Sequence, residues 1–232
     1  MKRILLIIFI CIFEYNISYA QNGKLHLGIQ SGLTIPNGSF ASGYGPYINN
    51  GYAAVGNNYK IYSELHIKNT FYVGLSYINF TNPMEDGNLR NGFNNQFSTN
   101  NAKVVANSST NGILGSLLFK GTETPFFIKG FMGFGYSRTV SIDAKNSIES
   151  ITIVQSTSDL DLITGISIGL YVPIKNKWFI DLEASYISSS AKPRDLILKD
   201  NNNNESVNIG SINYNQTVYN INLGLGIFIF RY

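Results

Sequence analysis

The residues best suited to chemistry are two histidines and a glutamate. His26, Glu64 and His66 are the side-chain types that commonly act as general acids and bases. A zinc site is not predicted, because such sites usually take three or four ligands and the chain has two histidines and one cysteine. We expect these three side chains to belong to a buried polar network and not to a catalytic or metal site.

Two glycine-containing motifs resemble known functional sequences. The Gly-Ile-Ser-Ile-Gly run at residues 165–169 has the spacing of a hydrolase nucleophile motif. That motif requires its serine at a turn from a strand into a helix, whereas this one lies inside an alternating strand pattern. The glycine-rich stretch at 130–135 is not followed by a helix pattern, as phosphate binding would require. We therefore predict no catalytic residues and no cofactor.

The composition describes a single folded domain. The chain has 232 residues, of which 44% are hydrophobic, 13% aromatic and 13% charged. Disordered chains are poor in aromatic residues and rich in charge, so the chain is not of that class. The net charge is +3 and no basic cluster occurs, which argues against a nucleic-acid partner.

What positions these residues is a series of segments that alternate between apolar and polar or small residues. Alternation with period two is the signal of a β-strand. Eight such segments occur, at residues 25–35, 59–67, 71–77, 113–119, 126–136, 160–172, 178–186 and 219–225. Short connections at 68–70, 120–125 and 173–177 alternate with long polar, Asn-rich ones at 36–58, 80–103, 139–158 and 188–215. Short turns at one end and long loops at the other predict an all-β fold, an eight-stranded antiparallel up-and-down transmembrane β-barrel.

The charges indicate which face of the barrel is inside. The less apolar face carries Lys60, Glu64, Lys129, Asp161, Asp181 and Glu183. A lysine or arginine facing lipid near the bilayer centre would cost about 2–4 kcal/mol, so these charges are expected in the lumen. We predict that Lys129 pairs there with Asp181 or Glu183. The predicted lumenal polar network consists of His26, Glu64, His66, Lys129, Asp181 and Glu183.

Aromatic residues mark the two ends of the apolar face. Such rings suit the boundary between lipid and water. The predicted girdles are Phe71, Phe126 and Trp178 beside the short turns, and Tyr59, Tyr77, Tyr136, Tyr186 and Tyr219 toward the long loops. In the last strand, Leu223 and Leu225 set one phase whereas Phe228, Phe230 and Tyr232 set the other. Either a bulge or a stretch that is apolar on both faces would reconcile them.

The N-terminus has the parts of a signal peptide. Lys2 and Arg3 are basic, residues 4–13 are apolar, and Ser18 and Ala20 are small residues at a cleavage point. We predict cleavage near Ala20, with the barrel domain at 21–232. The one cysteine, Cys11, lies in the removed segment, so the mature chain has no thiol chemistry.

Segments 28–36, 51–53, 125–136 and 230–232, together with the signal peptide, resemble the small outer-membrane β-barrel family that is abundant in Gram-negative bacteria, especially Bacteroidota. The resemblance implies a cell outer-membrane location. It also implies that the C-terminal Phe230 and Tyr232 are read by the barrel assembly machinery. The family has no shared catalytic residues to carry over.

We therefore expect a barrel that is surrounded by outer-membrane lipid and lipopolysaccharide. This barrel would display four long extracellular loops. The protein is expected either to have a structural role or to recognise an extracellular ligand through those loops. We do not expect it to be an enzyme. Eight strands are filled by their own side chains, whereas diffusion channels need about sixteen, so a wide pore is not predicted. Two alternatives stay open: a soluble barrel carrying an apolar ligand, and a barrel enzyme acting on outer-membrane lipid, for which His66 would be required.

Overall fold

A computed structural model describes most of the chain. The described residues are 24–41, 53–84, 102–105, 107–121, 125–138, 141–145, 150–155, 160–175, 177–190, 196–200, 205–210 and 215–230. The structural statements below concern these residues.

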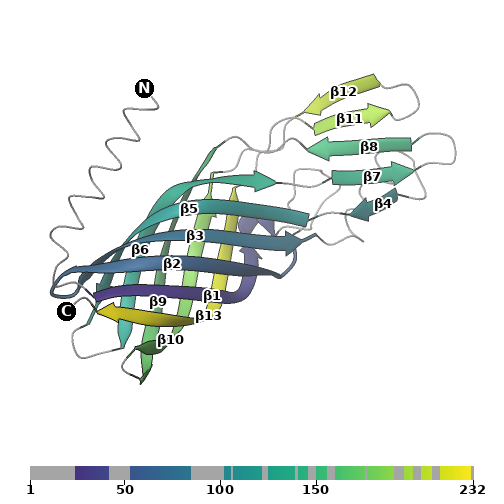
Figure 1. Cartoon of the computed structure of the whole chain (residues 1–232). Coiled ribbons are helices and arrows are strands. Elements are labelled where there is room, and N and C mark those ends of the chain that lie inside the picture. Colours follow the sequence, from purple (N-terminus) through teal and green to yellow (C-terminus); the bar gives the residue numbers. More distant parts are fainter. Residues whose placement is uncertain are drawn as a thin grey trace, which may run out of the picture.

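Eight long antiparallel strands form a closed barrel (Figure 1). Around the barrel the strands follow the order β1-β13-β10-β9-β6-β5-β3-β2, so β13 closes against β1. Their bounds are β1 Lys24–Asn37, β2 Gly56–Lys68, β3 Phe71–Pro83, β5 Asn107–Lys120, β6 Phe126–Arg138, β9 Asp161–Lys175, β10 Trp178–Ser189 and β13 Gln216–Phe230. The eight-stranded antiparallel barrel predicted from the alternation is confirmed.

The long connections hold five further strands that the sequence analysis treated as loops. β4 (Ala102–Val105), β7 (Ser141–Lys145), β8 (Ser150–Gln155), β11 (Leu196–Asp200) and β12 (Glu205–Gly210) form a second antiparallel sheet. Its order is β12-β11-β8-β7-β4, so three of the connections contribute to it. Figure 1 shows this sheet beyond the end of the barrel that carries the long connections. The sequence analysis expected long polar loops here, and parts of these three connections are instead strands.

The first long connection begins with a short turn of 3-10 helix, η2 (Gly38–Phe40). Phe40 at its end is fully buried, and its carbonyl accepts a hydrogen bond from the Ala53 amide at 3.0 Å. Ala53 in turn pairs with Met84, just after β3. The two described ends of this connection, at Phe40 and Ala53, are therefore hydrogen-bonded to each other, and Ala53 is paired with the end of β3. Among the described residues, no helix is long and apolar enough to cross a membrane.

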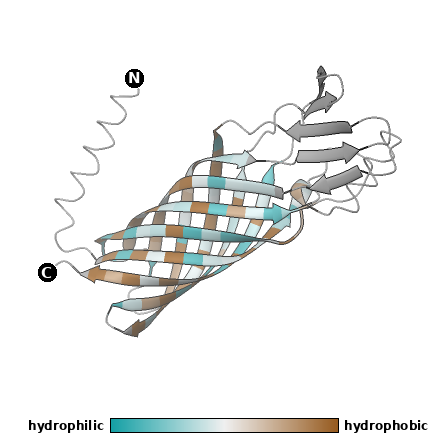
Figure 2. Ribbon diagram, turned by 45° about the vertical axis from the view of Figure 1, so that its right-hand side comes forward, coloured by the Kyte–Doolittle hydropathy of each residue, from teal (hydrophilic) through white to brown (hydrophobic). Residues whose placement is uncertain are grey.

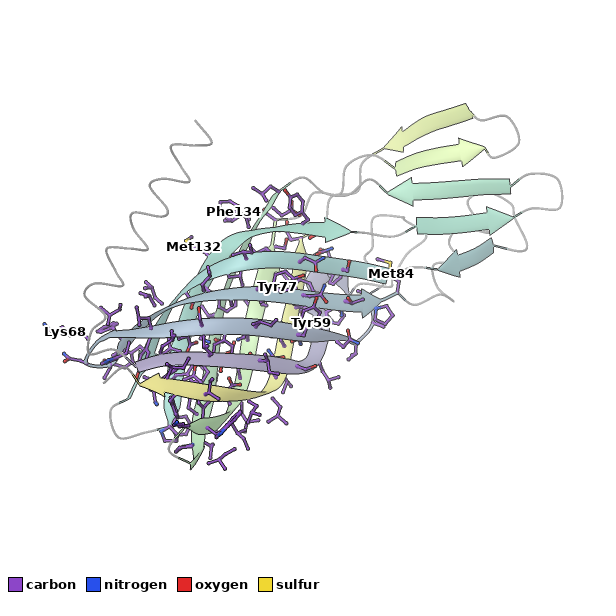
Figure 3. All side chains as sticks on the ribbon, in the orientation of Figure 1. Tyr59, Lys68, Tyr77, Met84, Met132 and Phe134 are labelled. Atoms are coloured by element: carbon purple, nitrogen blue, oxygen red, sulfur yellow. The ribbon has the colours of Figure 1, made fainter. Side chains whose placement is uncertain are left out.

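The barrel is apolar on the outside and polar on much of the inside. Figure 2 shows hydrophobic and hydrophilic residues alternating along the barrel strands. In Figure 3, Met132 and Phe134 project outward from β6, while Lys68 and Met84 mark the short-turn and long-connection ends. Since one side chain in two points outward, the alternation places the exposed apolar residues on one face.

The last strand follows one phase throughout. β13 pairs with β1 from Thr217 to Phe230 without a register shift. Leu223 and Leu225 are exposed, whereas Phe228 packs against buried aromatic rings inside the barrel. There is no bulge between these two strands, and the end of β13 is apolar on both faces, which is one of the two options left open by the sequence.

Glycines make room for large rings inside the narrow barrel. Four inward-facing glycines each pair with an aromatic residue directly opposite on the next strand: Gly28 with Tyr62, Gly165 with Phe131, Gly169 with Phe127, and Gly226 with Phe179. A Cβ at Gly226 would lie 2.2 Å from the Phe179 ring. The rings therefore lie over backbone that has no side chain, and the glycines are required by packing.

Substitution of Gly226 by alanine is expected to lower the free energy of unfolding by about 1–3 kcal/mol, because the added methyl overpacks the site against Phe179. Gly130→Ala is the matched control, since a Cβ there would have no atom within 4 Å. It should be neutral or slightly stabilising. Urea unfolding of both variants, folded in detergent micelles, makes the comparison. Equal losses for the two variants would contradict the packing role of Gly226.

Candidate functional site

The centre of the lumen holds a connected set of buried charges. The Glu183 carboxylate on β10 lies 2.6 Å from the Lys60 amine and 3.1 Å from the Lys129 amine. Lys129 also lies 2.7 Å from Glu64. All four side chains are buried. Buried charges must be paired, and here each lysine has a carboxylate partner. One of the two alternatives predicted for Lys129, pairing with Glu183, is found.

These pairs cross the bore of the barrel. Lys129 is on β6 and Glu64 is on β2, and β5 and β3 lie between these two strands in the sheet. The 2.7 Å contact between them therefore spans the lumen. Such a cross-bore pair ties opposite walls together and occupies the space that a solute would need.

Hydrogen bonds extend the charged set to neutral residues. The Gln30 amide donates to Asp181 at 2.6 Å and to Glu183 at 3.2 Å, and the Tyr62 hydroxyl also donates to Asp181. The Tyr171 hydroxyl donates to Glu64 at 2.6 Å, and the His26 Nδ1 lies 3.6 Å from that carboxylate.

Sequence reasoning assigned Lys60 to the polar face but omitted it from the network, and it missed Gln30, Tyr62 and Tyr171. A signal was present in the strand parity. Gln30 shares the parity of His26, and Tyr62 shares that of Glu64, so each pair faces the same side of its strand. Polar residues of matching parity on neighbouring strands therefore belonged in the predicted set.

His66 does not join the network. Its Nε2 lies 2.7 Å from the Asn69 carbonyl in the β2–β3 turn, and its ring stands 4.8 Å from that of Tyr72. The register of β2 against β3 shifts between His66 and Lys68, at the end of the strand. The histidine is therefore held by the turn and not by the lumenal carboxylates, which corrects its predicted place.

Aromatic rings close the short-turn end of the bore. Tyr62, Tyr72, Leu118, Phe127, Tyr171 and Phe179 form a buried cluster against which Phe228 packs. The His26 ring sits among them, 4.9 Å from Tyr72 and 4.8 Å from Phe228 between ring centroids. His26 is fully buried among these rings.

Little free space remains above the charged layer. The cavity there, lined by Asn58, Ser185, Asn220 and Asn222 among others, has a volume of about 20 Å³. That is room for roughly one water molecule. The lumen as described is filled by side chains, as expected for eight strands.

The motifs considered for catalysis have no suitable setting. Ser167 is buried in the middle of β9, with strand on both sides of it and no turn into a helix. Within the described part of the chain, no group of three or more His, Cys, Asp or Glu side chains could hold a metal ion.

The outer wall carries the aromatic residues that the sequence assigned to girdles. All eight are exposed. At the long-connection end the rings form neighbouring pairs, Tyr59 with Tyr77 at 5.9 Å and Tyr186 with Tyr219 at 5.4 Å between centroids. Figure 3 shows the first pair on adjacent strands. Between the two ends, exposed residues such as Ile128, Ile168 and Leu223 make the wall apolar.

Two parts of the sequence analysis lie outside the described residues. These are the signal peptide with its cleavage near Ala20, and the terminal Tyr232 together with the side chain of Phe230.

Comparison with solved structures finds other barrels. The chain is similar to Neisserial surface protein A, with a TM-score of 0.45 and 14% identity over 88% of this chain and 96% of that one. A major outer membrane protein from Thermus thermophilus gives 0.49 and 12%, over 89% and 99%. The outer membrane protease OmpT from Escherichia coli gives 0.47 and 11%, over 90% and 97%. At these identities no ligand or activity is carried over to this chain.

No protein-family model matches the chain, and no curated protein sequence matches it either. The resemblance to a Bacteroidota-type barrel family therefore stays a prediction.

Proposed function

We propose that the chain is an outer-membrane β-barrel protein whose barrel anchors a sheet-bearing extracellular region, without forming a wide pore and without enzymatic activity. The observation that carries this proposal is the inverted polarity of the barrel. Charged groups are buried in the lumen, whereas the exposed wall is apolar and has aromatic residues toward both ends. In an outer-membrane barrel the apolar band faces lipid, short turns face the periplasm and long connections face outside.

The arrangement inside the barrel argues against the two alternatives. A soluble carrier of an apolar ligand needs an apolar cavity, but the centre of this lumen is ionic, and the cavity beside Asn58 and Asn220 has a volume of about 20 Å³. An enzyme using His26 and Glu64 needs access to them, but both are 0–1% exposed. His66 is held by a turn carbonyl. The sheet of β4, β7, β8, β11 and β12 is the part best placed to meet an extracellular ligand.

Two measurements test this proposal. Full-length protein should be found in the membrane fraction, and its unboiled band in SDS should migrate differently from the boiled one, because a membrane barrel resists SDS until heated. In planar lipid bilayers it should give no large, stable conductance, because side chains fill the lumen. Recovery in the soluble fraction without a heat-dependent shift would contradict the membrane placement. Large stable pores would contradict the closed lumen.

The partner during biogenesis follows from the same proposal. The barrel assembly machinery would read the terminal aromatic residues, Phe230 and Tyr232. A chain lacking Tyr232 should insert less efficiently while its refolding in detergent stays normal. Unchanged insertion would rule out that role for Tyr232.

A further inference from the structure

Two glycines in the barrel wall are not explained by packing within the chain. Every other glycine of the described barrel strands would place a Cβ within 3.0 Å of a neighbouring atom. A Cβ at Gly130 would meet nothing within 4 Å, and one at Gly115 would meet only the Met132 carbonyl at 3.8 Å. Neither glycine has a positive φ, so neither is required by the backbone. Glycine in a strand interior weakens the strand, and it often marks a place where another molecule approaches closely.

Both glycines lie at the bottom of a hollow in the outer wall. Leu117 on β5, Gly130 on β6, Ile166 on β9 and Tyr186 on β10 are successive partners across the sheet. Gly115, Met132 and Thr164 form the adjacent row. The hollow that these side chains surround has a volume of about 820 Å³. Met132 on its rim projects outward and is 61% exposed (Figure 3).

The position and lining of the hollow indicate its ligand. Gly130 lies between the aromatic positions of its own strand, four residues after Phe126 and six before Tyr136. The lining is apolar apart from hydroxyl groups such as those of Thr164 and Tyr186, and it contains no charged residue. Its volume is within the range of about 300–1,000 Å³ that is usual for sites of small apolar ligands.

We propose that this hollow binds an acyl chain of a phospholipid. The inference rests on the proposed membrane placement, in which the hollow opens directly onto lipid hydrocarbon. A second barrel is a poorer occupant, because its wall is convex and the rim residues Leu117, Met132 and Ile166 would hold it off. The lining has no lysine or arginine that would hold a headgroup phosphate, so recognition in the hollow rests on the acyl chain. A flexible acyl chain can lie along the backbone at Gly115 and Gly130, where no side chain projects.

The test fills the hollow without disturbing the fold. Gly130→Leu places a side chain where the structure has open space, and Gly115→Leu does so at the neighbouring row. Ser31→Leu is the control, since Ser31 is exposed on β1, on the opposite side of the barrel. Each full-length variant is reconstituted in phosphatidylethanolamine vesicles, extracted into mild detergent and weighed by native mass spectrometry.

The wild type and Ser31→Leu should each retain a bound phospholipid, and Gly130→Leu and Gly115→Leu should lose most of it. Equal retention by all four proteins would overturn the proposal. A dimer mass in the wild type that Gly130→Leu abolishes would also overturn it, because a second copy would then be the occupant. The heat-dependent shift in SDS is recorded on the same samples. Its absence in the wild type would contradict the membrane placement itself, which separates that failure from failure of the lipid site.

Discussion

Replacement of Lys129 by methionine is expected to lower the free energy of unfolding by about 3–5 kcal/mol, because removing one member of a buried ion set leaves uncompensated charge. Lys129 contacts both Glu64 and Glu183. Without it, Lys60 is the one lysine left in the central set, facing three buried carboxylates that include Asp181. Equilibrium unfolding in urea, monitored on protein folded in detergent micelles, measures the loss.

A second substitution separates charge from packing. Lys129→Met combined with Glu64→Gln removes the lysine together with the carboxylate that it pairs with across the bore, while the amide oxygen can still accept the Tyr171 hydroxyl. The double variant should be more stable than Lys129→Met alone. Lys68→Met, at the exposed end of β2, is the control and should change stability by less than about 0.5 kcal/mol. If the double variant loses the sum of its two single losses, the pair is not coupled and the account of the network is wrong.

Arginine in place of Leu223 is expected to cost about 2–4 kcal/mol, since Leu223 is exposed on the apolar wall between its ends and would carry the charge into hydrocarbon. The measurement is the free energy of unfolding from lipid vesicles. If the wall faced water, the same substitution would change the free energy of unfolding by no more than about 0.5 kcal/mol. The size of the loss therefore distinguishes a wall that faces lipid from one that faces water.

The matched control for that substitution is Ile67→Arg. Ile67 is equally outward-facing but lies beside the short turn at the end of β2, where a charge reaches the interface. Its expected cost is about 0–1 kcal/mol. Similar costs for Leu223→Arg and Ile67→Arg would contradict a depth-dependent lipid environment.

The barrel was predictable because its signal is repeated in every strand. In β10, Trp178 and Leu182 face outward while Asp181 and Glu183 face inward, so period two alone assigns the faces. The cross-bore contact of Lys129 with Glu64 was not predictable in the same way. It depends on which strands lie opposite each other and on how far each side chain reaches, and neither follows from the parity of a single strand.

The second sheet was missed because the asparagine-rich composition of the long connections was given more weight than the strand-forming residues within them. The stretches around β11 and β12 are rich in asparagine, which favours turns, and this led to the prediction of loops. Yet β8 contains Ile151-Thr152-Ile153-Val154, four β-branched residues in succession, which are typical of strands. The long-range pairing of β8 with β11 joins two different connections, and no local pattern encodes it. The open space beside Gly115 and Gly130 could not be predicted from the sequence either. It depends on how the strands pair in the barrel wall, where no side chain of the described residues fills that space.

The most direct test of the account is the fluorescence of Trp178, the one tryptophan of the chain, which is exposed at the short-turn end of the outer wall. The wild-type protein is reconstituted in vesicles of phospholipids that carry bromine at known depths along their acyl chains. Bromine near the headgroups should quench Trp178 strongly, and bromine near the chain ends should quench it less, because indole rings lie at the lipid–water interface. Emission that is insensitive to bromine at every depth would place the apolar wall outside the bilayer and contradict the membrane barrel.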